Sequence, residues 1–285
     1  MEFIEIIKVV LLGIIEGITE WLPISSTGHM LLFDEVLPLK LSESFKEMFI
    51  VVIQLGAILA VVLLFWKQLF PLRRKQTEDG TMKTVTDKNI LSLWGKVIVA
   101  CLPAGIIGIL FDDILEKYLH TPLVISLTLI IYGVAFIWIE NRNKNKELPI
   151  KTTSEITYKQ ALLIGGFQVL SLIPGTSRSG ATILGALLIG VSRPAGAEFT
   201  FFLAIPVMAG ASAIKLLKFF MESGGFSGAE IGYLLIGSIV AFIVSCIAIK
   251  FLMNFVKKHD FKPFGWYRIA LGVIVIATLV IPTFF

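Results

Sequence analysis

Two stretches of the chain repeat one pattern and decide the fold: GIIEGITEWLPISSTG at residues 13–28 and GGFQVLSLIPGTSRSG at residues 165–180. A shift of 152 positions aligns them and pairs, for example, Ser25 with Ser177. Each is an apolar run that carries acid or amide groups and then breaks at proline, serine and glycine. The pattern predicts a helix, a break and a second helix, once in each half of the chain.

The composition indicates a membrane protein. Of the 285 residues, 56% are hydrophobic and 16% are charged, and the mean hydropathy is +0.86. A soluble domain typically carries about 25% charged residues. The net charge of +4 is small, and we expect a polytopic membrane protein with no nucleic-acid partner. In such a chain, interrupted apolar segments at corresponding positions of the two halves point to a binding site near the membrane midplane.

Six apolar stretches are each close to the roughly 20 residues that cross a bilayer as a helix. They run over about 47–66, 96–112, 121–139, 198–217, 230–252 and 266–284. Fifteen lysines and arginines lie in three of the connecting segments, against six on the other face. By the positive-inside rule the three basic segments are cytoplasmic, which places both termini outside. These segments are 67–96, 140–160 and 253–265.

This orientation predicts that the two interrupted stretches are re-entrant hairpins related by inversion, one from each membrane face. Non-helical backbone at membrane depth persists only when it is buried in protein or lines a wet cavity, so we expect the two breaks to meet. The predicted fold class is an all-α integral membrane protein with six transmembrane helices plus two re-entrant helical hairpins. It is a single domain over residues 1–285, with inverted repeats of about 1–140 and 141–285. The alternative is that 3–22 and 160–190 are ordinary full spans.

Two acids in the first stretch are the first groups suited to chemistry. Glu16 and Glu20 are four residues apart, so both project from one face of a helix. We expect that helix to stop at Leu22, because the residue before Pro23 is disfavoured in the α region. Intramembrane acids are functional candidates by default, and opposite an anionic substrate they suit a hard divalent cation such as Mg²⁺. The alternative is a shallow hairpin whose acids face water.

Hydroxyl groups and an imidazole follow the first break. Ser25 and Thr27 are candidate phosphate ligands and can also cap the returning half-helix, whose free N–H groups and positive dipole end form an anion site. His29 lies three residues after Ser26, within reach of its hydroxyl. A hydroxyl beside an imidazole is the minimal activated nucleophile, and an imidazole also suits acid–base work. A capping serine and a surface histidine are the plainer interpretation of the same residues.

The second break, residues 174–182, supplies small residues, hydroxyl groups and one arginine. Arg178 offers a planar fork of donors that matches phosphate oxygens, and the following half-helix again points its N-terminus at the break. The alternative is that Arg178 forms an ion pair with Glu16 or Glu20 and holds the hairpins together. The two breaks together predict a phosphate site, and the apolar surroundings imply a substrate with a lipid tail. The candidate phosphate ligands in the second break are Ser177, Arg178, Ser179 and Thr182.

At both breaks the chain closely resembles the undecaprenyl-diphosphatase family, the integral membrane phosphatases of the bacitracin-resistance type. The runs that carry the resemblance are EGITEWLPISSTGH at 16–29 and PGTSRSGAT at 174–182. The resemblance implies removal of one phosphate from undecaprenyl diphosphate at the outer face of the bacterial cytoplasmic membrane, with Mg²⁺ or Ca²⁺ as cofactor, and resistance to bacitracin. It places functional positions on Glu16, Glu20, Ser26, His29, Ser177, Arg178 and Thr182.

From these residues we hypothesise a reaction. The two acids hold the cation, Ser26 assisted by His29 attacks the terminal phosphorus, and the second break, led by Arg178, stabilises the transferring phosphoryl group. In the alternative chemistry a metal-bound water attacks directly. The rival from another class is a transporter, such as a lipid-carrier flippase, because facing inverted hairpins are a transporter architecture. The sequence leaves the cation, the chain length of the lipid and a homodimer open.

Overall fold

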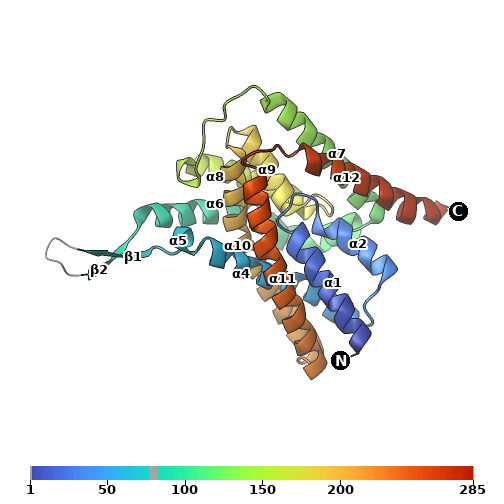
Figure 1. Cartoon of the computed structure of the whole chain (residues 1–285). Coiled ribbons are helices and arrows are strands. Elements are labelled where there is room, and N and C mark those ends of the chain that lie inside the picture. Colours follow the sequence, from blue (N-terminus) through green and yellow to red (C-terminus); the bar gives the residue numbers. More distant parts are fainter. Residues whose placement is uncertain (1, 77–81, 285) are drawn as a thin grey trace.

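The protein is described here from a computed structural model, which covers residues 2–76 and 82–284 and is dominated by helices (Figure 1). Within these residues, six helical segments are long and apolar enough to cross a membrane. They confirm the six predicted spans. The segments are Glu43–Leu64, Lys88–Phe111, Pro122–Asn143, Arg193–Ser223, Gly228–Phe255 and Lys262–Val280.

The helices that make these segments depart from the prediction only in detail. The first span is divided at Ile53 into α3 (Glu43–Val52) and α4 (Gln54–Leu64). The next four are single helices, two of them with an internal proline at Pro103 and Pro206. The last begins as α12 and continues as a π turn (Ile276–Val280) and a 3₁₀ turn (Ile281–Phe284). The four single helices are α6 (Lys88–Leu119), α7 (Pro122–Asn143), α10 (Arg193–Ser223) and α11 (Gly228–Phe255), and α12 covers Lys262–Val275.

Each interrupted stretch folds as a helical hairpin. The first consists of α1 (Phe3–Thr19) and α2 (Ser26–Val36), and the second of α8 (Tyr158–Val169), a 3₁₀ turn (Leu170–Leu172) and α9 (Arg178–Leu188). Helix α1 ends at Thr19 and not at Leu22, because the backbone already turns over residues 20–24 before it reaches the proline.

Contacts at the base of each hairpin show that its two ends lie side by side. In the first hairpin, the Lys8 ammonium donates to the Pro38 carbonyl oxygen at 2.6 Å and the Lys40 N–H donates to Glu5 at 3.1 Å. In the second, Ile150 pairs with Val191. Each hairpin therefore returns to the end from which it started. That the two hairpins are re-entrant segments in a membrane stays a prediction.

The two hairpins open at different ends of α10. Val191, at the base of the second hairpin, directly precedes α10. The other end of α10 reaches the chain that follows the first hairpin, where Lys215 lies 3.5 Å from Glu47. Lys215 is 22 positions after Arg193, which corresponds to about 33 Å of helix, so the two contacts lie far apart. That these ends correspond to opposite membrane faces stays a prediction.

The three basic segments gather at the end where the second hairpin opens. The Lys96 ammonium donates to the Ser154 carbonyl oxygen at 2.8 Å. The Phe261 N–H donates to the Glu140 carboxylate at 3.0 Å, and the same carboxylate forms an ion pair with Arg193. This grouping agrees with the charge asymmetry on which the predicted orientation depends.

The order of elements recurs in the two halves, as a hairpin followed by three spans, and so does the packing. Helix α1 packs on α11 and α8 packs on α6, while α7 lies along α12 (Figure 1). Glycines aligned by the 152-residue shift permit the first two contacts. A Cβ at Gly13 would lie 2.9 Å from the Gly237 carbonyl oxygen, and one at Gly165 would lie 2.3 Å from that of Ala100.

We expect Gly165→Ala to destabilise the protein by about 1–3 kcal/mol, because the new methyl group overpacks a backbone contact. The matched control is Gly166→Ala in the same helix, where an added Cβ meets no atom within 4 Å and removal of glycine should stabilise by about 0.5–1 kcal/mol. Thermal unfolding of the two purified variants measures the difference. Equal shifts would show that α8 does not depend on close approach to α6.

A 3₁₀ turn (Thr153–Glu155) precedes α8, and the segment between α4 and α6 contains one short helix and two strands. Helix α5 (Trp66–Leu69) is followed by the antiparallel strands β1 (Leu72–Gln76) and β2 (Met82–Thr86), in which Leu72 pairs with Thr86. The strands project from the helical body (Figure 1). They were not predicted, and they do not alter the helical fold class.

Candidate active site between the two hairpin breaks

The two breaks meet inside the helical body, as predicted. The Ser179 hydroxyl donates to the Glu20 carbonyl oxygen at 3.0 Å. Arg268 of α12 joins both breaks, because its guanidinium donates to the carbonyl oxygens of Pro23 at 3.2 Å and Gly175 at 2.9 Å. Residues from the two ends of the chain therefore form one buried centre.

The backbone is strained at matched positions of the two breaks. Among residues 2–76 and 82–284, only Ser25 and Ser177 are non-glycine residues with positive φ, at 73° and 69°. Each directly precedes the returning helix, α2 or α9. Such backbone costs on the order of 1–3 kcal/mol per residue and clusters at functional sites. The two interrupted stretches therefore share an unfavourable backbone conformation at matched serines, in addition to their sequence pattern.

The side chains of these two serines differ in their partners. The Ser177 hydroxyl caps α9 by accepting the Gly180 N–H at 3.1 Å, and it also lies 3.1 Å from the Ser179 hydroxyl. The Ser25 hydroxyl is buried and has no hydrogen-bond partner within the described part of the chain. The side-chain cap that Ser25 was predicted to supply is thus absent from the first break, whereas Ser177 supplies one in the second, where none was predicted.

Arg178 and Glu20 form an ion pair across the site. The guanidinium Nη2 lies 2.8 Å from Glu20 Oε1, and both side chains are largely buried. Arg178 also donates to the Thr200 carbonyl oxygen of α10 at 3.0 Å. The ion-pair alternative for Arg178 is therefore observed, with Glu20 as the partner.

Glu16 lacks a comparable partner. Its side chain is fully buried, and neither carboxylate oxygen accepts a hydrogen bond of normal geometry from a described residue, although the Gln54 amide and Arg178 lie nearby. Gln168, its match in the second half, is also buried and without partners for its amide. A buried charge is costly unless it is paired or coordinates a metal, and the role of Glu16 as a cation ligand stays a prediction.

All the buried, unpartnered side-chain atoms found in residues 2–76 and 82–284 belong to the two interrupted stretches. This concentration is informative, because natural proteins leave few buried polar groups unsatisfied and each calls for an explanation. The same described residues contain no group of three or more His, Cys, Asp or Glu side chains arranged to hold a metal. The unpartnered atoms belong to Glu16, Trp21, Ser25, Gln168 and Thr176.

His29 is held at both ring nitrogens. Nδ1 lies 2.7 Å from the Ser25 carbonyl oxygen and Nε2 lies 2.8 Å from the Tyr267 hydroxyl. The expected contact with the Ser26 hydroxyl is not formed: no hydrogen bond joins Ser26 and His29 in the described structure. Any reaction that uses both groups must therefore rearrange one of them.

The remaining predicted residues lie at or beside the breaks. The Thr182 hydroxyl is buried, donates to the Arg178 carbonyl oxygen at 2.9 Å and lies 2.9 Å from the Thr200 hydroxyl. Thr27, in the first turn of α2, is half-buried. The structure thus brings the predicted residues together, while their roles toward a ligand stay predictions.

Sequence reasoning missed several members of the centre. These residues lie in spans for which the sequence predicted no site residue. They are Thr200, Tyr267 and Arg268. Arg268 carried a usable signal, since a charged residue inside an apolar span is a functional candidate. Thr200 and Tyr267 carried none, because neither residue type is unusual in a membrane helix.

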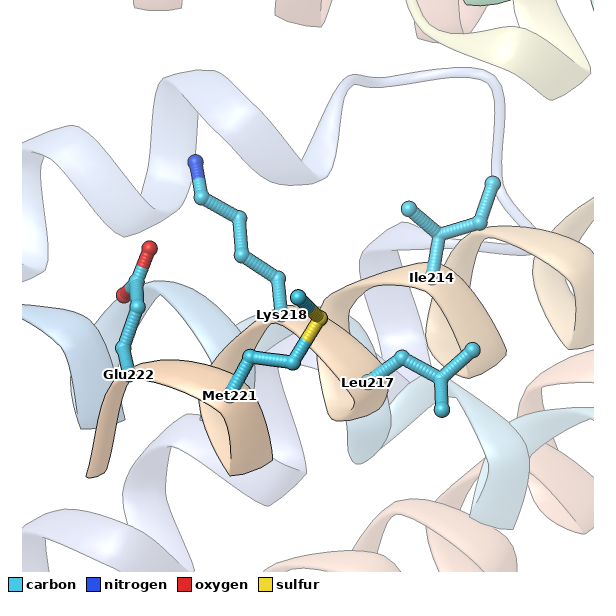
Figure 2. Close-up of a pocket in the computed structure, with 5 residues that line it drawn as sticks. All are labelled: Ile214, Leu217, Lys218, Met221 and Glu222. Atoms are coloured by element: carbon cyan, nitrogen blue, oxygen red, sulfur yellow. The ribbon is translucent and has the colours of Figure 1, made fainter. Parts of the chain in front are cut away.

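A separate concavity lies along α10 and does not belong to this centre. It measures about 530 Å³ and is lined by apolar and charged side chains of that single helix (Figure 2). Its lining residues are Ile214, Leu217, Lys218, Met221 and Glu222.

The fold and the site define a multi-pass α-helical membrane protein with a charged centre buried between two hairpin breaks. A family model described as bacitracin resistance protein BacA matches residues 9–274, and the chain belongs to this family. This confirms the resemblance found at the two motifs.

Curated relatives are similar over nearly their whole length, and each is named an undecaprenyl-diphosphatase. One from Enterococcus faecalis is 64% identical, with 97% of this chain and 98% of the relative covered. One from Desulfitobacterium hafniense is 57% identical, with 97% and 96% covered. One from Clostridium acetobutylicum is 55% identical, with 99% and 100% covered.

Proposed function

We propose that the chain hydrolyses undecaprenyl diphosphate to undecaprenyl phosphate and inorganic phosphate, and so recycles the lipid carrier of cell-wall synthesis and confers bacitracin resistance. The observation that carries this proposal is the meeting of Glu16, Glu20 and Arg178 in one buried centre of a membrane protein whose relatives bear that enzyme's name. The lipid tail would lie among the apolar helices while the diphosphate reaches the breaks.

A divalent cation, Mg²⁺ or Ca²⁺, fits the first break. The unpartnered, buried oxygens of Glu16 are hard ligands of the type that these cations prefer. Glu16 and Glu20 would hold the ion, and substrate phosphate oxygens would complete its ligand set, since the described residues supply no third acid. When bound, the cation would supply neutralisation of negative charge on the diphosphate.

The second break would bind and orient the phosphate. Arg178 can present its planar fork to phosphate oxygens, and the N-termini of α2 and α9 add backbone N–H donors. The unpartnered Ser25 hydroxyl is free to donate, whereas Ser177, Ser179 and Thr182 must exchange present hydrogen bonds to do so. Positioning of this kind is the main source of rate in phosphoryl transfer.

Ser26 is the proposed nucleophile. Its oxygen forms a bond to the terminal phosphorus as the bond to the bridging oxygen breaks, which releases undecaprenyl phosphate. His29 accepts the serine proton, and water then cleaves the phosphoserine to release phosphate. Because Nε2 of His29 is bonded to Tyr267 and not to Ser26, this version requires a rotation at the site. Direct attack by water is the alternative and leaves Ser26 as a phosphate ligand.

For location, we propose the bacterial cytoplasmic membrane, with both termini and the opening of the active site at the outer face. Support comes from the gathering of the basic segments at the end where the second hairpin opens, which is the cytoplasmic end by the positive-inside rule. The first hairpin, which carries the acids, Ser26 and His29, opens at the other end.

The test is phosphate release from undecaprenyl diphosphate by the purified protein in detergent with Mg²⁺. We expect release by the wild type, a loss of kcat of at least about a hundredfold in Ser26→Ala, and normal release by Ser44→Ala, a half-buried serine in the first turn of α3 and away from the breaks. Near-normal turnover of Ser26→Ala would favour direct attack by water. No release by the wild type, with lipid movement across vesicles, would instead indicate the transporter that the repeated hairpins also suit.

A further inference from the structure

The hydrogen bonds of His29 determine which ring nitrogen carries the proton and which one can accept a proton. A carbonyl oxygen can only accept, so Nδ1, at 2.7 Å from the Ser25 carbonyl, carries the proton. In the neutral imidazole Nε2 is then the acceptor, and the Tyr267 hydroxyl donates to it at 2.8 Å. The two rings are parallel within 7°, with centroids 5.6 Å apart, so the contact also fixes the plane of the imidazole.

The matched position in the second break shows that this arrangement is specific to the first. There the Ser177 carbonyl accepts the backbone N–H of Ala181 at 2.9 Å, and Ala181 aligns with His29 under the 152-residue shift. The Ser25 carbonyl instead receives the imidazole. Both serines have positive φ, so the difference lies in the side chain four residues later.

Tyr267 reaches His29 from a helix that is itself tied to both breaks. Its neighbour Arg268 is fully buried and donates to the carbonyl oxygens of Pro23 and Gly175. These bonds fix this turn of α12 beside the first break. The second half of the chain therefore supplies the partner of an imidazole that belongs to the first half.

We propose that Tyr267 is a positioning residue for His29. With the Ser25 carbonyl it makes Nε2 the nitrogen that exchanges protons with the reacting groups, and it holds the ring in register with α2. This role rests on the proposed function, since it assigns a partner within the same reaction site. In the present arrangement the Tyr267 hydroxyl occupies Nε2, so it holds the plane of the imidazole until the Ser26 hydroxyl replaces it at that nitrogen for proton transfer.

The first test compares two losses of one hydroxyl. Tyr267→Phe keeps the stacked ring and should lower kcat roughly 10- to 100-fold with little change in KM, the usual effect of removing a hydrogen bond that orients a functional histidine. Tyr233→Phe is the matched control, because among the described residues that hydroxyl accepts a hydrogen bond only from the Glu2 N–H, at 3.0 Å and at the opposite end of α1 from the first break. Normal kcat in Tyr267→Phe would overturn the proposal.

The second test asks whether Tyr267 acts through the imidazole. In a His29→Ala background, Tyr267→Phe should have no further effect, whereas a merely structural role would lower kcat again. The ¹⁵N spectrum of histidine-labelled protein should show His29 protonated at Nδ1, with its Nε2 resonance shifted in Tyr267→Phe and unchanged in Tyr233→Phe. Removal of His120 and His259 assigns the signals.

The outcomes separate the two levels of inference. A His29 protonated at Nε2 in the wild type, or additive effects in the double variant, would overturn the positioning role while leaving hydrolysis intact. A wild type that releases no phosphate would overturn the proposed function itself, and the spectra would then decide the hydrogen bond alone.

Discussion

Glu16→Gln should lower kcat about a thousandfold or more without destabilising the protein. The substitution keeps the shape of the side chain and removes its charge. Glu16 is fully buried, and its carboxylate oxygens accept no hydrogen bond of normal geometry from the described residues, so little native hydrogen bonding is lost. Loss of an uncompensated buried charge is neutral or favourable for folding, whereas loss of a cation ligand removes charge stabilisation from the reaction. Phosphate release and thermal unfolding measure the two effects.

The control is Glu5→Gln in the same helix. Glu5 accepts hydrogen bonds from the Lys8 ammonium at 2.9 Å and the Lys40 N–H at 3.1 Å, so its variant should lose stability and keep kcat. Calcium binding without lipid, followed by titration calorimetry, should weaken in Glu16→Gln and not in Glu5→Gln. Unchanged calcium binding in Glu16→Gln, or a fall in its stability with normal kcat, would contradict the assignment of Glu16 as a cation ligand.

Arg178→Gln should also lower kcat about a thousandfold or more, because the guanidinium supplies positive charge where negative charge develops in the reaction. It should also destabilise by about 3–5 kcal/mol, since it leaves Glu20 buried without its partner. The double variant Glu20→Gln with Arg178→Gln separates these effects. Stability should return when both charges are removed, whereas activity should not.

A second ion pair, between a buried carboxylate and a partly exposed arginine, provides the control for Arg178. Glu140 and Arg193 pair at the base of the second hairpin, away from both breaks. Arg193→Gln should lower the melting temperature, and the folded protein should retain its kcat. If the double variant at Glu20 and Arg178 regained activity together with stability, the pair would serve only to hold the hairpins together.

The fold was largely predictable because its signals are local in sequence. Each span is a run of apolar residues, and each break is marked by Pro23 or Pro174 with adjacent serine and glycine. The distribution of lysine and arginine also predicted that the three basic segments lie at one end of the molecule, without knowledge of any contact. The exact end of the first helix was less predictable. Pro23 predicted an end at Leu22, whereas α1 ends at Thr19 and residues 20–24 form a turn.

The members of the candidate site that lie in the two breaks were predictable, whereas the members from other helices and the pairing of all of them were not. The residues of the two breaks could be named from their chemistry, but the choice of Glu20 over Glu16 as the partner of Arg178 depends on how two hairpins dock. The partner of His29 lies 238 positions away in the sequence. Ser25 and Ser177 are identical in type and backbone conformation, yet only Ser177 caps its helix, a difference that no local pattern carries.

The Glu20–Arg178 ion pair has a consequence for turnover under the proposed function. Because Glu20 occupies Arg178 before substrate arrives, binding exchanges one anion for another at the guanidinium. A tethered carboxylate competes at high effective concentration, which weakens the hold on any phosphate, including the product. Under the proposed function, the Glu20 carboxylate thus competes with bound phosphate for Arg178. This competition favours the release of inorganic phosphate after each cycle.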